Sequence, residues 1–357
     1  MARFHSLTVK DIQKETRDCI SVAFDLPVEL HSEFQFIQGQ YLTLRSWIDG
    51  EEVRRSYSLC SSPLDRELRV AIKHIPDGKF SSFAHTTLKE GDVLDVMSPM
   101  GNFYSTLSSE HQKKYVAFAA GSGITPIMSI MKTVLRTEAN SQFTLCYGNR
   151  SVSSIIFREE IEGLKNQYLD RLQIHHFLTR EELDVPLFNG RFSEEKLARI
   201  FATLLEPVSV DEYFLCGPEE MIRTIEKELL EAGVSAKRIH KELFVASSPQ
   251  TKTKVAASER SDLTCEVIVK DGGKQFRFDW EMDAENLLDA ALGYGADLPY
   301  ACKGGVCCTC KAKLVEGKVE MEVNYALEEE EVEAGYILTC QARPLTNKVI
   351  VDYDLAL

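Results

Sequence analysis

The chain has 357 residues, of which 44% are hydrophobic, and a formal net charge of −14. This length predicts two or three domains, and the apolar content is typical of a soluble globular protein. We find no apolar run long enough to cross a membrane and no signal-peptide core in residues 1–18, so we expect a cytoplasmic protein without a membrane span. Because no export signal is found, the ten cysteines are expected to be reduced and to serve as metal or cluster ligands, not to form disulfides.

The negative charge is concentrated near the C-terminus. Residues 261–357 contain nineteen Asp and Glu but only nine Lys and Arg. Such asymmetry indicates either a docking surface for a basic partner or simply a solubilising acidic face, and both interpretations stay open. It argues against nucleic acid as a partner.

The first part of the chain is β-rich. Short alternating runs are separated by Pro, Gly and Asp turns, which predicts a small antiparallel β-barrel over residues 1–108. Strands are expected at 6–12, 19–26, 41–45 and 68–73.

Two motifs in this barrel could bind a phosphorylated ring cofactor. At a strand end, Arg55 can pair with a phosphate, Tyr57 on the same strand face can lie against a flat ring, and the hydroxyl of Ser58 could reach a ring nitrogen. Further on, residues 78–82 open a predicted helix with serine as the N-cap and free N–H groups for an anion. The candidate residues of this second motif are Gly78, Phe80, Ser81 and Ser82.

Strands and helices alternate over residues 109–245, which predicts a doubly wound α/β domain with a parallel sheet. Strands are expected at 115–120, 143–147, 172–178 and 213–216, and helices at 126–136 and 218–231.

Glycine turns follow two of these strands. Gly121 and Gly123 permit a pyrophosphate to approach a helix N-terminus, and Pro126 suits the first helical turn although it stands in place of the third glycine of G-x-G-x-x-G. Cys216, Gly217 and Pro218 form the second turn, at the sheet edge where a nicotinamide should lie, although a cysteine there is often only packing.

The strand expected at 143–147 is followed by Arg150 and not by an acidic residue. Arg150 could pair with a 2′-phosphate, so the sequence favours NADPH over NADH. The eight histidines, including His175 and His176, show no metal-ligand spacing, and we interpret them as structural or surface residues.

Residues 246–262 are polar and are predicted to be a linker, followed by a compact domain over 263–357. In this domain we expect strands near 265–270 and 275–279 and a helix near 284–293. Four cysteines have the plant-type C-x4-C-x2-C spacing with a distant fourth ligand, which predicts a [2Fe–2S] cluster: Cys302, Cys307, Cys310 and Cys340. Gly304 and Gly305 would let backbone N–H groups approach the sulfur atoms. Zinc is the alternative, but structural zinc sites usually pair two C-x2-C knuckles.

Residues 1–245 resemble the ferredoxin–NADP reductase superfamily. The resemblance rests on three motifs that occur in the same order as in that superfamily: R-x-Y-S, G-S-G-I-T-P and C-G-P. With a plant-type ferredoxin domain, implying a β-grasp fold, the resemblance covers nearly the whole chain. The reductase subunits of bacterial oxygenases are more similar still, in stretches 4–9, 142–145, 147–150, 297–307, 324–328 and 335–341.

The resemblance implies a role for each candidate. Arg55 would bind the flavin diphosphate, Tyr57 would stack on the isoalloxazine, and residues 78–82 would hold the FAD pyrophosphate, although the sequence alone does not separate FAD from FMN. Thr125 and Cys216 would border the nicotinamide, and Phe244 would lie near the other flavin face. Ser58, Cys216 and Glu242 would form the catalytic set. Cys308 departs from the pattern because a small non-ligand residue often stands there.

The implied activity is electron transfer from NADPH through FAD and the cluster to a di-iron oxygenase. The di-iron centre would lie in other chains of a multicomponent monooxygenase, since this chain has no E-x-x-H pair. One alternative is the reductase of a Rieske-type ring-hydroxylating oxygenase. Another is a redox-sensing subunit without catalysis, which the full set of flavin and nucleotide motifs disfavours.

Overall fold

The computed structural model describes residues 3–244, 265–280 and 284–356. The chain forms two compact units. Apart from short segments of its first and fourth strands, one unit comprises His5–Val53 and Tyr57–Phe244, and the other is the C-terminal part of the chain. The predicted linker over 246–262 lies outside the described residues. Within the described ranges, no helix is both long and apolar enough to cross a bilayer.

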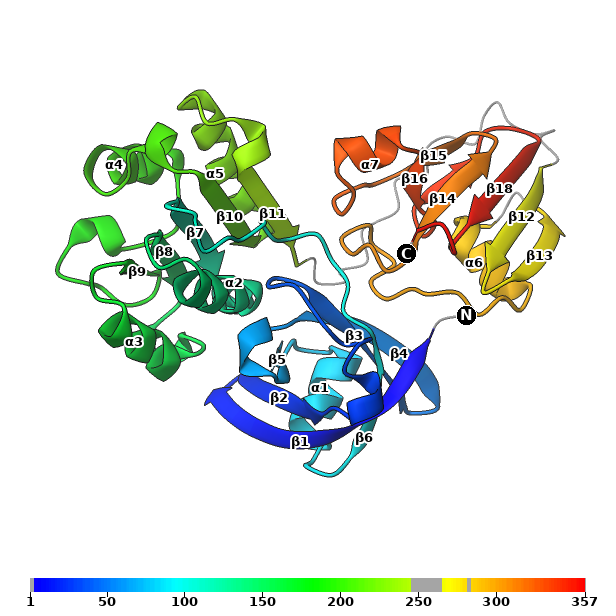
Figure 1. The fold of residues 1–357 in the computed structure, drawn as a ribbon, viewed down its shortest axis with the longest axis horizontal. Helices are drawn as coiled ribbons and strands as arrows, with labels where there is room; N and C mark the ends of the chain where they lie inside the picture. The colour runs from blue at the N-terminus through cyan, green and yellow to red at the C-terminus, as the bar shows by residue number, and fades with distance from the viewer. Residues whose placement is uncertain (1–2, 245–264, 281–283, 357) are drawn as a thin grey trace. The chain divides into compact units, whose positions relative to one another are not determined.

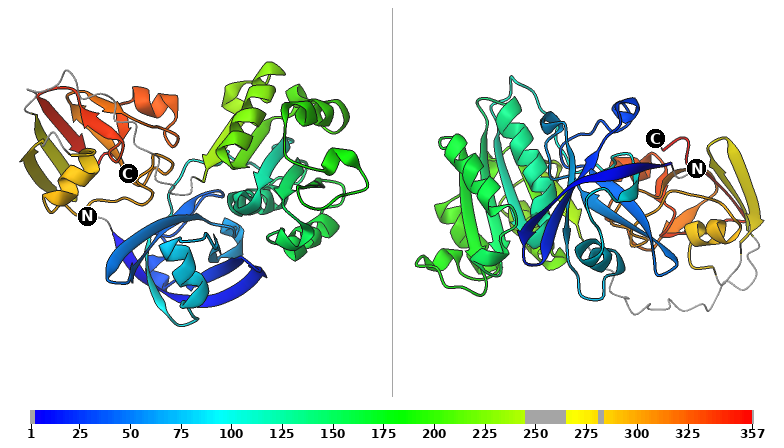
Figure 2. Two further views of the ribbon diagram at one scale, coloured as in Figure 1. Left: turned by 180° about the vertical axis from the view of Figure 1, so that it is seen from behind. Right: turned by 90° about the horizontal axis from the view of Figure 1, so that it is seen from below.

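The N-terminal sheet is the predicted antiparallel β-barrel (Figure 1). Its six strands, in the spatial order β4-β3-β6-β1-β2-β5, are β1 Phe4–Thr16, β2 Cys19–Asp25, β3 Tyr41–Ile48, β4 Glu51–Ser58, β5 Leu68–Lys73 and β6 Val93–Met97. Just beyond β4, Leu59 bridges to Val70 of β5, which joins the two edges of the sheet. The alternating pattern puts the apolar side chains of the strands into one core, which also takes up Phe80 and Ala84 of helix α1 (Lys79–Thr86). Helix α1 packs against β3 and β5 (Figure 2).

The predicted serine N-cap of this helix is wrong. Gly78 occupies the N-cap position and makes no side-chain cap. The hydroxyl of Ser81 instead accepts the N–H of Ile75 at 3.2 Å from inside the first helical turn. A Cβ atom at Gly78 would lie 2.6 Å from that hydroxyl oxygen, so the tight turn requires glycine.

The second sheet of this unit is fully parallel, as predicted, with the order β11-β10-β7-β8-β9. Its strands are β7 Lys114–Ala120, β8 Gln142–Asn149, β9 Leu172–Leu178, β10 Glu212–Gly217 and β11 Ile239–Leu243. Helices α2 (Ile124–Thr137) and α3 (Arg158–Gln167) cover one face, and α4 (Glu194–Thr203) and α5 (Glu219–Glu231) cover the other (Figure 1). The strand order reverses between β7 and β10, which is where such sheets bind ligands.

The barrel and the parallel sheet are tied together by polar contacts. The Ser62 hydroxyl lies 2.9 Å from the Thr133 hydroxyl of α2. Asp65, in the same turn as Ser62, accepts hydrogen bonds from Lys132 at 2.8 Å and from Arg136. These contacts explain why the first two domains form one compact unit.

The C-terminal unit has the predicted β-grasp architecture. Its mixed sheet has the order β13-β12-β18-β14-β16 and is accompanied by a two-stranded sheet of β15 and β17. The elements are β12 Glu266–Asp271, β13 Lys274–Asp279, α6 Leu287–Gly293, β14 Lys311–Glu316, β15 Val319–Met321, α7 Glu329–Glu333, β16 Tyr336–Leu338, β17 Ala342–Pro344 and β18 Lys348–Asp352. Strand β12 pairs in parallel with β18 and antiparallel with β13, so the first and last strands of the unit are neighbours.

Candidate functional site

The end of β4 and the start of α1 form the candidate flavin surface. Tyr57 is half-buried, and its ring lies 5.6 Å from that of Phe80, at 43°. Phe80 is only 1% exposed, so it supports Tyr57 from the core. The first N–H groups of α1 have no helical acceptor, which suits an anion. An accessible aromatic ring beside a helix N-terminus fits a flavin with its diphosphate.

Arg55 and Ser82 also belong to this set. Arg55 lies in β4, half-buried, and one guanidinium nitrogen donates to the backbone carbonyl of Arg54 at 2.7 Å. The Ser82 hydroxyl lies 3.3 Å from Nε2 of His74.

Ser58 and Glu242 meet although 184 residues separate them in sequence. The Ser58 hydroxyl donates to Oε2 of Glu242 at 3.0 Å. Burial raises the pKa of Glu242 to about 8, and the hydrogen bond from Ser58 offsets part of this rise. The carboxyl group therefore holds a proton at neutral pH, beside the end of the strand that carries Tyr57.

Cys216 completes the predicted catalytic set. It pairs with Glu242 in the β10–β11 register and is fully buried. Burial raises the pKa of the Cys216 thiol well above its usual range, and the charge that Glu242 carries once it ionises adds to this rise. The thiol thus stays neutral and cannot act as a thiolate nucleophile.

The two glycine turns pack directly on each other. A Cβ atom at Gly123 would lie 2.1 Å from the carbonyl oxygen of Cys216, so only glycine lets the turn after β7 approach the turn after β10. Thr125 is buried, and its hydroxyl donates to the Ser122 carbonyl at 3.0 Å. Pro126 is buried in the first turn of α2.

A cavity of about 820 Å³ opens at the carboxyl ends of the strands. Gly121, Arg150, Gly217, Pro218 and Phe244 of the predicted set line it. Its size and its position at the reversal point of the sheet suit a dinucleotide.

Sequence reasoning missed two arginine residues of this cavity. Arg180 and Arg191 line it together with Arg150, and all three are exposed. The backbone N–H of Arg180 donates to the Arg150 carbonyl at 2.8 Å, which keeps these two chain segments together. Glu194 also lines the cavity but is paired with Lys227 at 2.6 Å. The signal for Arg180 was its position two residues after the end of β9, close to the position of Arg150 directly after β8.

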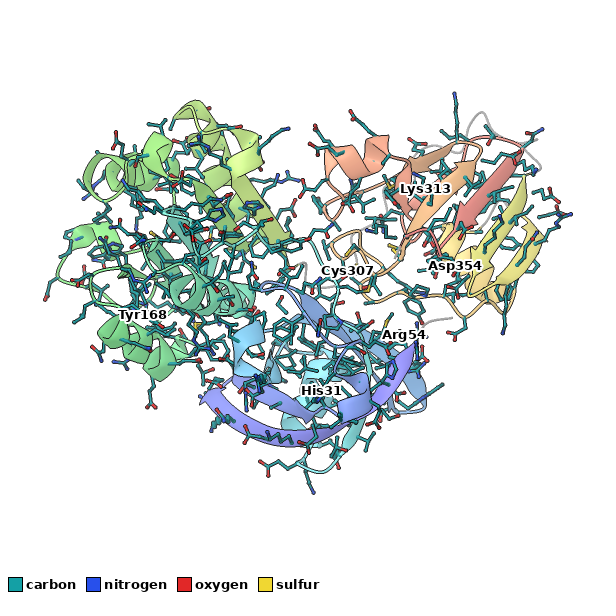
Figure 3. All side chains as sticks on the ribbon, viewed as in Figure 1. His31, Arg54, Tyr168, Cys307, Lys313 and Asp354 are labelled. Carbon is teal, nitrogen blue, oxygen red and sulfur yellow. The ribbon has the colours of Figure 1, made fainter. Side chains whose placement is uncertain are left out.

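The four predicted cluster cysteines lie in two pairs in the C-terminal unit. Sγ of Cys307 lies 3.1 Å from Sγ of Cys302, and Cys310 interacts with Cys340 (Figure 3 labels Cys307). Two thiol pairs match two iron ions with two protein ligands each.

Backbone N–H groups converge on the first ligand. The N–H of Gly304 donates to Sγ of Cys302 at 3.3 Å. The Cys307 thiol and then the backbone N–H groups of the loop lower the pKa of Cys302 to about 6, although burial opposes this. Such a cradle suits thiolates, so the residues present fit a cluster. Cys308 is also buried.

His175 and His176 lie in β9. The His175 ring stacks on Phe188 with centroids 5.7 Å apart, and burial lowers the pKa of both histidines.

Comparisons with known proteins cover the whole chain. Family models of the oxidoreductase FAD-binding domain, the oxidoreductase NAD-binding domain and the 2Fe-2S iron-sulfur cluster binding domain match residues 6–104, 118–227 and 269–345. The chain is 46% identical to one of the subunits of 1,2-phenylacetyl-CoA epoxidase from Escherichia coli K12, over 99% of both chains. The chain belongs to the family of oxygenase reductases that join these three domains.

Two further comparisons agree with this assignment. The ferredoxin reductase component of 3-ketosteroid-9-alpha-monooxygenase from Rhodococcus rhodochrous is 36% identical, over 97% of this chain and 96% of the relative. The solved structure of phthalate dioxygenase reductase has the same fold, with a TM-score of 0.59, 22% identity and 98% coverage of both chains. As a member of this family, the chain is an oxidoreductase that transfers electrons from NAD(P)H through FAD to a [2Fe–2S] cluster. The resemblance inferred from the sequence is thereby confirmed.

Proposed function

We propose that this chain is the NADPH-dependent reductase of a phenylacetyl-CoA epoxidase and delivers electrons to a di-iron oxygenase in separate chains. The observation that carries the proposal is the 46% identity to the Escherichia coli relative, over 99% of both chains. All ten cysteines lie in the described residues and none of them forms a disulfide, which supports a reducing, cytoplasmic setting.

In this proposal the domains are residues 1–108 for FAD, 109–245 for NADP(H) and 263–357 for the cluster, with a linker over 246–262. When bound, FAD accepts a hydride and the cluster accepts single electrons, which is chemistry that side chains alone cannot supply. The protein binds and orients these cofactors and holds protons near them.

On the flavin side, Arg55 and the start of α1 bind the diphosphate, and Tyr57 supports the ring on its Phe80 backing. Glu242 holds a proton at its carboxyl group and accepts a hydrogen bond from Ser58 at 3.0 Å, so the pair could keep a proton available to a bound flavin. The neutral, buried Cys216 gives the nicotinamide an apolar, polarisable neighbour.

On the nucleotide side, Arg150 and Arg180 favour NADPH. Two exposed guanidinium groups beside one cavity can pair bidentately with a 2′-phosphate, which NADH lacks. In the C-terminal unit, the iron ligands are Cys302, Cys307, Cys310 and Cys340.

The test is to mix the purified chain with the catalytic subunits of a phenylacetyl-CoA epoxidase and NADPH, with and without phenylacetyl-CoA, and to follow the oxygenated product. We expect product only when this chain is present, and none with the Cys340→Ser variant. Fast cytochrome c reduction without product would keep the electron-transfer activity but reject this partner, which would favour a Rieske-type oxygenase. Absence of cytochrome c reduction in the fully loaded protein would favour the redox-sensing role.

A further inference from the structure

Gln341 follows the last predicted cluster ligand and makes more than one polar contact at the cluster site. Its side-chain nitrogen Nε2 lies 3.1 Å from the carbonyl oxygen of Lys303, 2.9 Å from that of Cys340, and 3.5 Å from Sγ of Cys340. One amide group therefore touches both the cysteine loop and the distant ligand.

The orientation of this amide is fixed by chemistry. Carbonyl oxygens only accept hydrogen bonds, so the two carbonyls of Lys303 and Cys340 select the NH₂ end of the side chain over its oxygen. The same NH₂ group then faces Sγ of Cys340. An NH₂ group has only two hydrogens, so one of them is shared between a carbonyl oxygen and this sulfur atom, in a three-centre contact of the N–H···S type.

The cysteine loop gives Gln341 little freedom to move. A Cβ atom at Gly305 would lie 3.2 Å from Cγ of Gln341, so the glutamine stem packs on the glycine backbone. Gly305 has a φ of +73°, and its carbonyl accepts the N–H of Tyr325 at 3.0 Å. The backbone carbonyl of Gln341 also accepts the N–H of Glu322 at 3.0 Å. The amide is therefore held by packing as well as by its own hydrogen bonds.

We propose that Gln341 is a positioning residue that raises the reduction potential of the cluster through an N–H···S hydrogen bond to Cys340. The inference rests on the proposed cluster ligands. A one-electron reduction adds negative charge that is spread over the sulfur atoms, and a hydrogen-bond donor to a ligand sulfur stabilises the reduced form more than the oxidised form. Gln341 acts together with the backbone donors of the loop, such as Gly304 at Cys302.

The test is a redox titration of the full-length, cofactor-loaded protein, followed by electron paramagnetic resonance of the reduced cluster. Gln341→Leu keeps similar bulk without a donor, and Gln341→Glu keeps the shape but cannot donate from an ionised carboxylate. The matched control is Gln275→Leu, since Gln275 is exposed on β13. We expect the ratio of reduced to oxidised cluster at a fixed potential to fall about tenfold in both Gln341 variants, or about 59 mV for a one-electron couple.

A wild-type potential in both Gln341 variants would overturn the inference. If only Gln341→Leu loses the cluster, the reduction potential of Gln341→Glu decides whether the inference holds. If both Gln341 variants lose the cluster while Gln275→Leu retains it, Gln341 holds the cysteine loop in position and does not tune the reduction potential, which would overturn the inference. A wild-type protein without any reducible [2Fe–2S] signal would instead refute the proposed ligands themselves, which is a separate result.

Discussion

Replacing Glu242 by glutamine should remove the pH dependence of flavin reduction by NADPH. The carboxyl group accepts the Ser58 hydroxyl at 3.0 Å, and burial raises its pKa to about 8. If the protonated form is the active one, the rate follows the protonated fraction. That fraction is about nine-tenths at pH 7 and about one-tenth at pH 9 for a pKa near 8.

We therefore expect the wild-type rate to fall about tenfold between pH 7 and pH 9. The Glu242→Gln variant should show no such fall, because an amide does not titrate. At pH 7 the variant should be slower by about 100-fold, the lower range for a positioned proton donor. The assay is anaerobic stopped-flow flavin absorbance at saturating NADPH, which does not depend on the cluster or on the oxygenase.

Glu212→Gln is the matched control. Glu212 lies at the opposite end of β10 from Cys216, and although burial opposes it, the hydrogen bonds from His240 and Lys113 lower the pKa of Glu212. In the Glu212→Gln variant, the rate of flavin reduction should still fall above pH 8, as in the wild type. A Glu242→Gln profile that declines like the wild type would refute the assignment of the titrating group to Glu242.

The same pKa shift predicts a change in stability. The folded-state pKa of about 8 lies above the usual value of 4.5, so the folded chain binds more protons than the unfolded chain between these values. The contribution of protonated Glu242 to the stability of the folded chain is complete below about pH 4.5 and is lost as the pH rises towards 8. The Tm of Glu242→Gln minus that of the wild type should therefore increase from pH 5 to pH 8, and a constant difference would contradict the shift.

Two further predictions concern the nucleotide and the cluster. Arg180→Ala should raise the KM for NADPH about tenfold or more without changing the KM for NADH, since a hydrogen bond to a charged group is worth about 1.5–3 kcal/mol. The control is Arg199→Ala, at an exposed residue of α4, which should change neither KM. Equal effects of Arg180→Ala on both nucleotides would contradict the 2′-phosphate role. Cys308→Ala should keep the visible absorption of the cluster while Cys340→Ser loses it, and loss in Cys308→Ala would overturn the ligand assignment.

The strands of the parallel sheet could be predicted because burial on both faces makes them continuously apolar. Strand β7 is an example, with Tyr115 to Ala119 almost fully buried. Helix α3 was missed because it buries only Ile161 and Leu164, and the residue before it, Phe157, has a φ of +60° and no capping side chain. Strands β15, β16 and β17 have three residues each, too few for a periodic pattern.

The candidate site was predictable where a motif adjoins a strand end. Arg150 was found on that rule, and the same rule applied to β9 would have found Arg180. The membership of Ser58 and Glu242 in one catalytic set follows from the resemblance to the family, whereas their hydrogen bond is seen only in the structure. Gln341 could not be predicted, because its contact with Lys303 joins residues 38 positions apart through side-chain packing.

The contacts of Asp65 with Lys132 and Arg136 also bear on how this protein can be recombined with its relatives. A chimera cut between the flavin and nucleotide domains would separate this ion cluster, the Ser62–Thr133 pair and the Ser58–Glu242 pair in one step. Residues 5–244 are therefore better exchanged as one cassette. Modular swapping for a new electron acceptor should be sought after Phe244, where the chain leaves this unit.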